Sequence, residues 1–76
     1  MAKKLIISFP TTADAMAMES AFKVLNRLGR LIPVPREMSA GCGMAYATDP
    51  IYEEEIINFM ASHHIDHEEV SMIDMR

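Results

Sequence analysis

At the centre of the chain stands Ile32-Pro33-Val34-Pro35-Arg36-Glu37-Met38-Ser39-Ala40-Gly41-Cys42-Gly43, a stretch with two prolines at its start and two glycines at its end. The residues just before it, Arg30 to Val34, have the apolar character of a short β-strand. Pro33 has no backbone N–H to donate to a neighbouring strand, and a proline is tolerated in a sheet mainly at an edge. The strand that enters this stretch is therefore expected at the edge of a sheet, and residues 35–42 are expected to form a loop.

A strand and a helix are expected before this stretch. Residues 4–9 form a short apolar run rich in isoleucine, which is typical of a strand and is ended by a proline. Thr11 or Thr12 can cap the helix that follows, with Asp14 in the acidic position of a capping box, and Gly29 is placed to end it. The helix has one broad apolar face, formed by Ala15, Met18, Phe22, Leu25 and Leu28.

A third strand and a second helix are expected after the stretch. Residues 43–48 alternate small or polar side chains with larger ones, as a strand does. Asp49 is a typical N-cap residue, and Pro50 is favoured at the first position of a helix. This helix is expected to run to about Ser62, and its inward face consists of Tyr52, Ile56, Phe59 and Met60.

A last strand is expected from His67 to Met72, with Val70 and Met72 on one face and residues 74–76 frayed. The order is therefore β-α-β-β-α-β in a single domain of residues 1–76. In about this length, that order is typical of the ferredoxin-like α+β fold, in which two helices cover one face of an antiparallel sheet. The second strand of this fold is an edge strand, which agrees with the proline argument. The fold hosts enzymes, metal chaperones, RNA binders and regulatory modules, so it does not decide the function.

The composition restricts the classes of function. The formal net charge is −4 and the lysines and arginines are scattered, which argues against nucleic acid as a partner. The longest apolar run, Leu5-Ile6-Ile7, is too short to span a bilayer, and polar residues follow the N-terminal lysines too soon for a signal peptide. We therefore expect a cytoplasmic protein with no membrane partner.

Cys42 is the one cysteine of the chain, so an internal disulfide or a CxxC redox pair is excluded. Gly41 and Gly43 leave its sulfur free of neighbouring side chains, as a reachable thiol requires. The thiolate is the nucleophilic form, and it needs nearby positive charge or oriented N–H groups, for which Arg36 and the amides around the two glycines are candidates. A buried structural cysteine is the alternative, although glycine on both sides is unusual inside a strand.

Other side chains that could bind metals give weaker patterns. His63, His64 and His67 could join Cys42 in a metal site, but adjacent histidines on a helix point about 100° apart and no second cysteine completes a familiar zinc pattern. The eight methionines are best read as adaptable core residues. The glutamates at 53–55 are best read as a solvated face favoured by the helix dipole. We expect no metal and no cofactor.

The run from Pro35 to Gly43, Pro-Arg-Glu-x-Ser-x-x-Cys-Gly, resembles a family of small bacterial domains described as selenium/sulfur carrier-like proteins. The resemblance extends over nearly the whole chain, and this run is its most specific part. It implies that Cys42 is the carrier residue and that Arg36, Ser39 and Gly43 complete the motif.

The chemistry that this resemblance implies needs one thiol. A cysteine desulfurase-like donor presents a persulfide, Cys42 takes its outer sulfur or selenium, and an acceptor protein receives it. Arg36 would stabilise the anion, and Ser39 would hydrogen-bond either the anion or the loop. Such a protein is a component of a relay rather than a free-standing enzyme. The alternative is a non-catalytic interaction or ligand-sensing module with a structural Cys42, which could form a homodimer through an exposed sheet face or edge.

Overall fold

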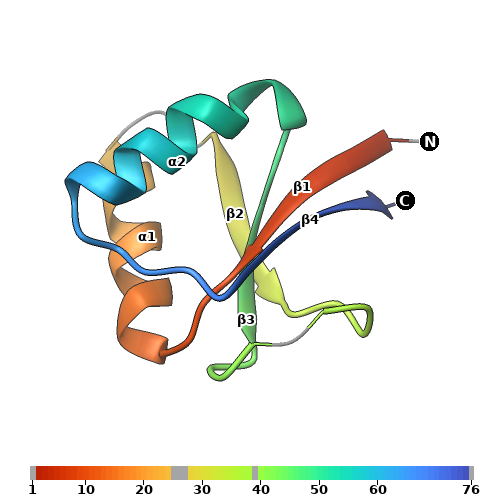
Figure 1. The fold of residues 1–76 in the computed structure, drawn as a ribbon, viewed down its shortest axis with the longest axis horizontal. Helices are drawn as coiled ribbons and strands as arrows, with labels where there is room; N and C mark the ends of the chain where they lie inside the picture. The colour runs from red at the N-terminus through yellow and green to blue at the C-terminus, as the bar shows by residue number, and fades with distance from the viewer. Residues whose placement is uncertain (1, 25–27, 39, 76) are drawn as a thin grey trace.

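The chain forms a four-stranded antiparallel sheet with two helices on one of its faces (Figure 1). The computed structural model describes residues 2–24, 28–38 and 40–75. The elements in these ranges are β1 (Ala2–Ser8), α1 (Thr12–Val24), β2 (Gly29–Pro33), β3 (Met44–Thr48), the 3-10 helix η1 (Pro50–Tyr52), α2 (Glu53–Ser62) and β4 (Glu69–Met75). This β-α-β-β-α-β order confirms the predicted ferredoxin-like α+β fold.

The strands lie in the order β2-β3-β1-β4, so β2 and β4 form the two edges of the sheet. The edge position predicted from Pro33, the last residue of β2, is therefore confirmed. Ser8, at the end of β1, lies opposite Ala45 on one side and Glu69 on the other. The end of β1 thus meets the start of β3 and the start of β4 at the same end of the sheet.

The main core lies between the sheet and the two helices. Its buried members are Leu5, Ile7, Phe9, Ala15, Met18, Tyr46, Ile56, Met60 and Ile65. Ala15 and Met18 confirm the predicted apolar face of α1, whereas Leu25 and the side chain of Phe22 lie outside the described part of the chain. On α2 the predicted inward face is also confirmed, because Ile56 and Met60 are fully buried and its other two members pack against the same core.

The start of α1 follows the predicted capping box. The Asp14 N–H donates to Thr11 Oγ1 at 3.2 Å, and the Thr11 hydroxyl donates to Asp14 Oδ2 at 2.6 Å. The prediction that Gly29 ends this helix is wrong, because Gly29 is the first residue of β2. A Cβ at this position would collide with the Ala47 carbonyl oxygen and the Tyr46 ring, so the close approach of β2 to β3 requires the glycine.

The second helical segment begins differently from the prediction. Asp49 caps it as expected, since the Ile51 N–H donates to Asp49 Oδ1 at 3.1 Å. Pro50, however, starts the 3-10 turn η1, and the α-helix begins only at Glu53. None of the helices in the described ranges is long and apolar enough to cross a membrane.

The last strand is longer than predicted at its C-terminal end. It begins at Glu69 rather than His67 and continues to Met75. The prediction that residues from Asp74 onwards fray is wrong for Asp74 and Met75, which pair with Lys3 and Ala2 of β1. Pairing along all of β1 supplies the hydrogen bonds that a free chain end would lack.

The sheet face opposite the helices carries a second, smaller core. Ile6 and Ala45 are fully buried there beneath Met38, which comes from the β2–β3 loop and is only 8% exposed. Partly buried apolar side chains surround these three residues, namely Ile32, Val34, Ala47 and Ile73. The β2–β3 loop is therefore held against the sheet by an apolar anchor.

Candidate functional site

The loop between β2 and β3 consists of two consecutive turns. In the first turn, the Met38 N–H donates to the Pro35 carbonyl oxygen at 3.0 Å. In the second, the Gly43 N–H donates to the Ala40 carbonyl oxygen at 3.1 Å. The second turn, Ala40 to Gly43, contains Cys42 and is called the Cys42 turn below. The loop thus presents its one thiol on a hydrogen-bonded turn.

Gly43 closes the Cys42 turn at the start of β3. Its φ of +77° lies in the left-handed region, where a side chain is strained, and no atom lies within 4 Å of the place that a Cβ would take. The Val34 N–H donates to the Gly43 carbonyl oxygen at 3.0 Å, which joins the two ends of the loop. Glycine is required here by the backbone conformation and not by crowding.

Gly41 is required for a different reason. A Cβ on Gly41 would collide with the carbonyl oxygen of Pro10, in the connection between β1 and α1. The Gly41 N–H donates to Glu68 Oε1 at 2.9 Å, in the connection between α2 and β4. The Cys42 turn is therefore docked between two segments that are distant in the sequence.

The Cys42 thiol is half-buried and packs against the edge of the main core. Its Sγ accepts a hydrogen bond from the Met44 N–H at 3.3 Å and donates one to the Met44 carbonyl oxygen at 3.5 Å. An N–H directed at sulfur stabilises an anionic thiolate. The amides of Gly41 and Gly43, expected for this role, donate instead to Glu68 and Ala40, so Met44 supplies the N–H at the sulfur.

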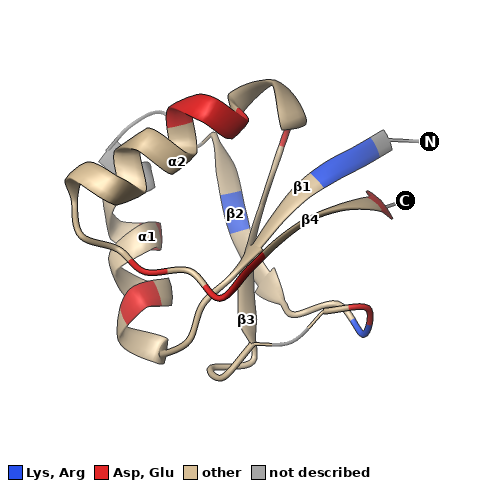
Figure 2. Cartoon of the chain, in the orientation of Figure 1, with Lys and Arg blue, Asp and Glu red and all other residues tan. Residues whose placement is uncertain are grey.

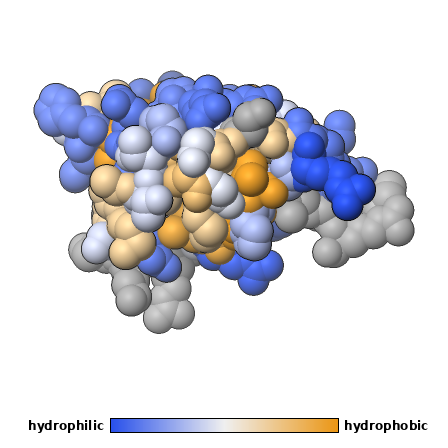
Figure 3. All heavy atoms as spheres, turned by 90° about the horizontal axis from the view of Figure 1, so that it is seen from below, coloured by the Kyte–Doolittle hydropathy of each residue, from blue (hydrophilic) through white to orange (hydrophobic). Residues whose placement is uncertain are grey.

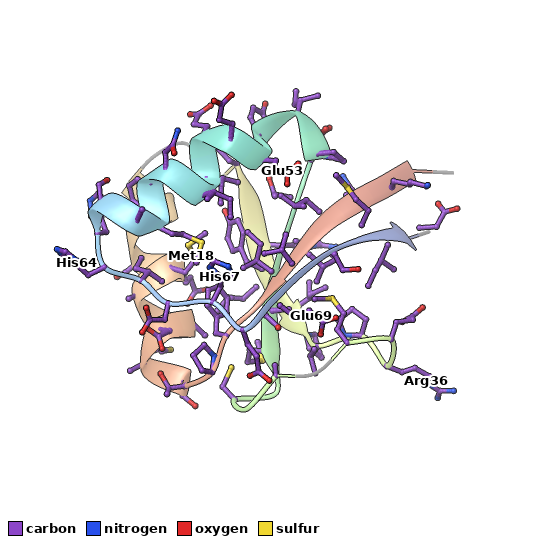
Figure 4. The ribbon with its side chains drawn as sticks, viewed as in Figure 1. Met18, Arg36, Glu53, His64, His67 and Glu69 are labelled. Atoms are coloured by element: carbon purple, nitrogen blue, oxygen red, sulfur yellow. The ribbon has the colours of Figure 1, made fainter. Side chains whose placement is uncertain are left out.

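Arg36 and Ser39, the other two predicted site residues, are not placed at the thiol. Arg36 lies in the first turn of the loop, is exposed, and points away from the protein (Figure 4). Ser39 lies outside the described residues. The structure therefore puts Arg36 on the same loop as Cys42 but in the neighbouring turn, and the predicted effect of Arg36 on the Cys42 anion stays a prediction.

Charged groups surround this end of the sheet unevenly. Carboxylates of α1 and of the α2–β4 connection lie on one side of the Cys42 turn, and Arg36 and Glu37 lie at the tip of the first turn (Figure 2). The Asp66 N–H donates to Asp14 Oδ1 at 3.3 Å, which ties the α2–β4 connection to the start of α1. Seen from below, the middle of this surface carries apolar and weakly polar side chains, with strongly hydrophilic ones toward its edges (Figure 3).

His63 and His64 lie at the C-terminal end of α2, and His67 lies in the α2–β4 connection. The His63 ring stacks on Phe59 with 4.0 Å between ring centroids, and His64 points away from the protein (Figure 4). In the described ranges, no three His, Cys, Asp or Glu side chains converge to hold a metal ion. A surface depression of about 210 Å³ is lined by Ile57, Met60, Ala61, Ile65, Asp66 and His67, so it is separate from the Cys42 turn.

Tyr46 is the one buried phenol on the helix side of β3, and it is 1% exposed. Burial raises the pKa of Tyr46 from 10.0 to about 12, and a hydrogen bond with the Gly29 backbone offsets only part of that effect. The phenol therefore stays neutral at physiological pH and acts as a core residue.

Comparison with known protein families gives a match over residues 4–71 to the family described as "Putative Se/S carrier protein-like". The matched range covers most of the chain and includes the whole Cys42 turn. The chain belongs to this family. No curated protein and no solved structure matches it. Membership in the Se/S carrier-like family confirms the resemblance seen in the Pro35 to Gly43 run, and its description directs attention to the one residue of this chain that can bind selenium or sulfur covalently.

Sequence reasoning missed three residues that shape this site. The Met44 N–H donates a hydrogen bond to the sulfur, and Glu68 accepts one from the Gly41 N–H. The Pro10 carbonyl oxygen lies against Gly41. Glu68 lies 27 residues from Gly41, so no local pattern connects the two. The strand order offered a partial signal, because it places the residues that follow β1 and precede β4 beside the loop that precedes β3.

Proposed function

We propose that this protein carries sulfur or selenium as a persulfide or selenopersulfide on Cys42. The observation that carries the proposal is the position of the one thiol: it lies on a glycine-flanked turn, half exposed, with a backbone N–H at its sulfur. The Se/S carrier-like family description supports the same reading. Nothing beyond the thiol is needed for the chemistry, so we propose no cofactor.

Loading proceeds by exchange at sulfur. The Cys42 thiolate attacks the outer sulfur of a cysteine persulfide on a donor protein such as a cysteine desulfurase. A new S–S bond forms at Cys42, the S–S bond of the donor breaks, and the donor cysteine leaves as a thiolate. The outer sulfur keeps its oxidation state, so no external oxidant or reductant is required, and the proton lost by the Cys42 thiol is taken up by the leaving thiolate or by solvent.

Unloading is the same exchange in reverse. A thiolate of an acceptor protein attacks the outer sulfur or selenium, and Cys42 leaves as a thiolate that the Met44 N–H stabilises. Arg36 adds positive charge to the same loop, and Ser39 lies between the two turns in the sequence. We place this relay in the bacterial cytoplasm, where thiols are kept reduced.

The test is intact-protein mass spectrometry after incubation with a cysteine desulfurase and either cysteine or selenocysteine. We expect a gain of one sulfur or one selenium atom that a reductant removes and that Cys42→Ala abolishes. A synthetic peptide of residues 35–43 is the matched control, because it has the same thiol without the fold. Loading of the folded protein no faster than loading of the peptide would contradict a dedicated carrier.

A second function is favoured by the partial burial of Cys42 against the main core. In this alternative the thiol is structural, and the domain is an interaction or ligand-sensing module. Loading by the donor separates the two functions, since a structural thiol gains no sulfur or selenium from a cysteine desulfurase. The alternative also predicts normal partner or ligand binding in Cys42→Ala, whereas the carrier loses its function in that variant.

A further inference from the structure

We propose that Glu68 is a positioning residue for the Cys42 thiol. Its carboxylate accepts the Gly41 N–H at 2.9 Å, and this bond joins the Cys42 turn to the connection that leads into β4. The inference deepens the proposed carrier function and gains its significance from it. It concerns how the thiol is held between transfers and not whether transfer occurs.

The Glu68 backbone is itself fixed to the sheet. Its N–H donates to the Ser8 carbonyl oxygen at 2.7 Å, one residue before the β1–β4 pairing begins with Ser8 opposite Glu69. The backbone of this residue is therefore an extension of the ladder, and its side chain reaches from that fixed point to the turn. A carboxylate that accepts a backbone N–H forms a charge-assisted hydrogen bond, which is stronger than a neutral one.

The other contacts of the Cys42 turn do not replace this bond. Gly41 lies against the Pro10 carbonyl oxygen, but this is a van der Waals contact, since the Gly41 N–H is directed to Glu68. The Val34 N–H holds the Gly43 carbonyl oxygen, but this bond lies at the start of β3 and does not hold Gly41. The bond to Glu68 is the side-chain hydrogen bond that holds the exposed side of the turn in the described part of the chain.

The docked turn keeps the thiol partly inside the protein. Cys42 is half-buried, with Sγ directed to Met44, whereas a carrier must present its sulfur to the active sites of two different partners. The docked form is therefore the resting arrangement, and transfer requires the turn to move outward. Loss of the Glu68 bond shifts the balance toward the undocked form.

The test is the rate of Cys42 alkylation by iodoacetamide in the wild type, Glu68→Ala, Glu68→Gln and Asp66→Ala. Glu68→Ala should react about twofold to tenfold faster, the change expected for a hydrogen bond of ordinary net strength. Glu68→Gln should lie closer to the wild type, because its amide oxygen also accepts the Gly41 N–H. Asp66→Ala is the matched control, since Asp66 is acidic, exposed and in the same connection, and its bond to Asp14 uses the backbone N–H.

Measurement in low urea separates local movement from global unfolding. Undocking of one turn exposes little surface, so the alkylation rate should hardly change with urea below the unfolding transition. The inference is overturned if Glu68→Ala reacts like the wild type, if Glu68→Gln reacts as fast as Glu68→Ala, or if the faster rate rises steeply with urea. Alkylation requires no donor protein, so these results stand apart from the loading experiment, whose failure would overturn the carrier function instead.

Discussion

Ionisation of Tyr46 should lower the free energy of unfolding at alkaline pH, and Tyr46→Phe should remove this contribution. The folded protein holds the phenol with a pKa of about 12, against 10.0 in the unfolded chain. Because the pKa is raised on folding, the unfolded state loses its proton first as the pH rises. The contribution of Tyr46 is therefore fully present below pH 10 and is lost between about pH 10 and pH 12.

The shift of two units sets the size of the effect. Relative to Tyr46→Phe, the free energy of unfolding of the wild type should fall by about 1.4 kcal/mol at pH 11 and by about 2.3 kcal/mol at pH 12. Such a loss is a large fraction of the stability of a domain of this size. The comparison with the variant cancels the titration of all other groups, which the two proteins share.

Urea denaturation of both proteins at pH 9, 10, 11 and 12 measures the difference directly. Absorbance of the ionised phenol gives a second readout, because the step lost in Tyr46→Phe should be the late one, near pH 12. Parallel stability curves for the two proteins across this range would refute the reasoning, since they would show that the phenol ionises equally easily in the folded and unfolded chains.

Four further changes test the contacts around the loop and the first helix by urea denaturation. Gly41→Ala should lower the free energy of unfolding by about 1–3 kcal/mol, because its Cβ collides with the Pro10 carbonyl oxygen. Gly43→Ala should lower it by about 1–2 kcal/mol, because Gly43 has a positive φ. Either variant as stable as the wild type would contradict the corresponding cause. Met38→Ala should lower the free energy of unfolding by about 2 kcal/mol, the low end for a buried methionine, because Met38 covers only the smaller core. A negligible loss would show that Met38 does not anchor the loop on the sheet. Thr11→Ala should cost about 1 kcal/mol through loss of the helix cap, and unchanged stability would contradict a stabilising role for this cap.

Local signals predicted most of the fold. The capping box at Thr11 and the proline at the end of the second strand are local patterns of a few residues. They correctly predicted the start of α1 and the edge position of β2. Gly29 was misread because its local context fits a helix end, whereas its actual constraint is the approach of a strand about 18 residues further along the chain. The length of β4 was missed for the same reason, since its last residues are ordered by pairing with the start of β1.

The candidate site divides in the same way. Cys42 was identifiable from its flanking glycines, and the need for glycine on both sides has a physical basis in the structure. The partners of the turn were not identifiable, because Glu68 and Pro10 reach it only through the order of the strands. Met38 could not be recognised as an anchor either, since a methionine in a polar loop has no periodic pattern that would mark it as buried.

The pairing of Ala2 with Met75 brings the two ends of the described chain side by side, at the end of the sheet away from the Cys42 turn (Figure 1). The seven residues of β1 place the paired chain ends about 20 Å from the end of the sheet that carries the Cys42 turn. An affinity tag or a surface linkage at either terminus would therefore leave the Cys42 turn accessible to other proteins. Immobilised protein can thus serve as bait in a search for the proposed donor and acceptor, with immobilised Cys42→Ala as the control.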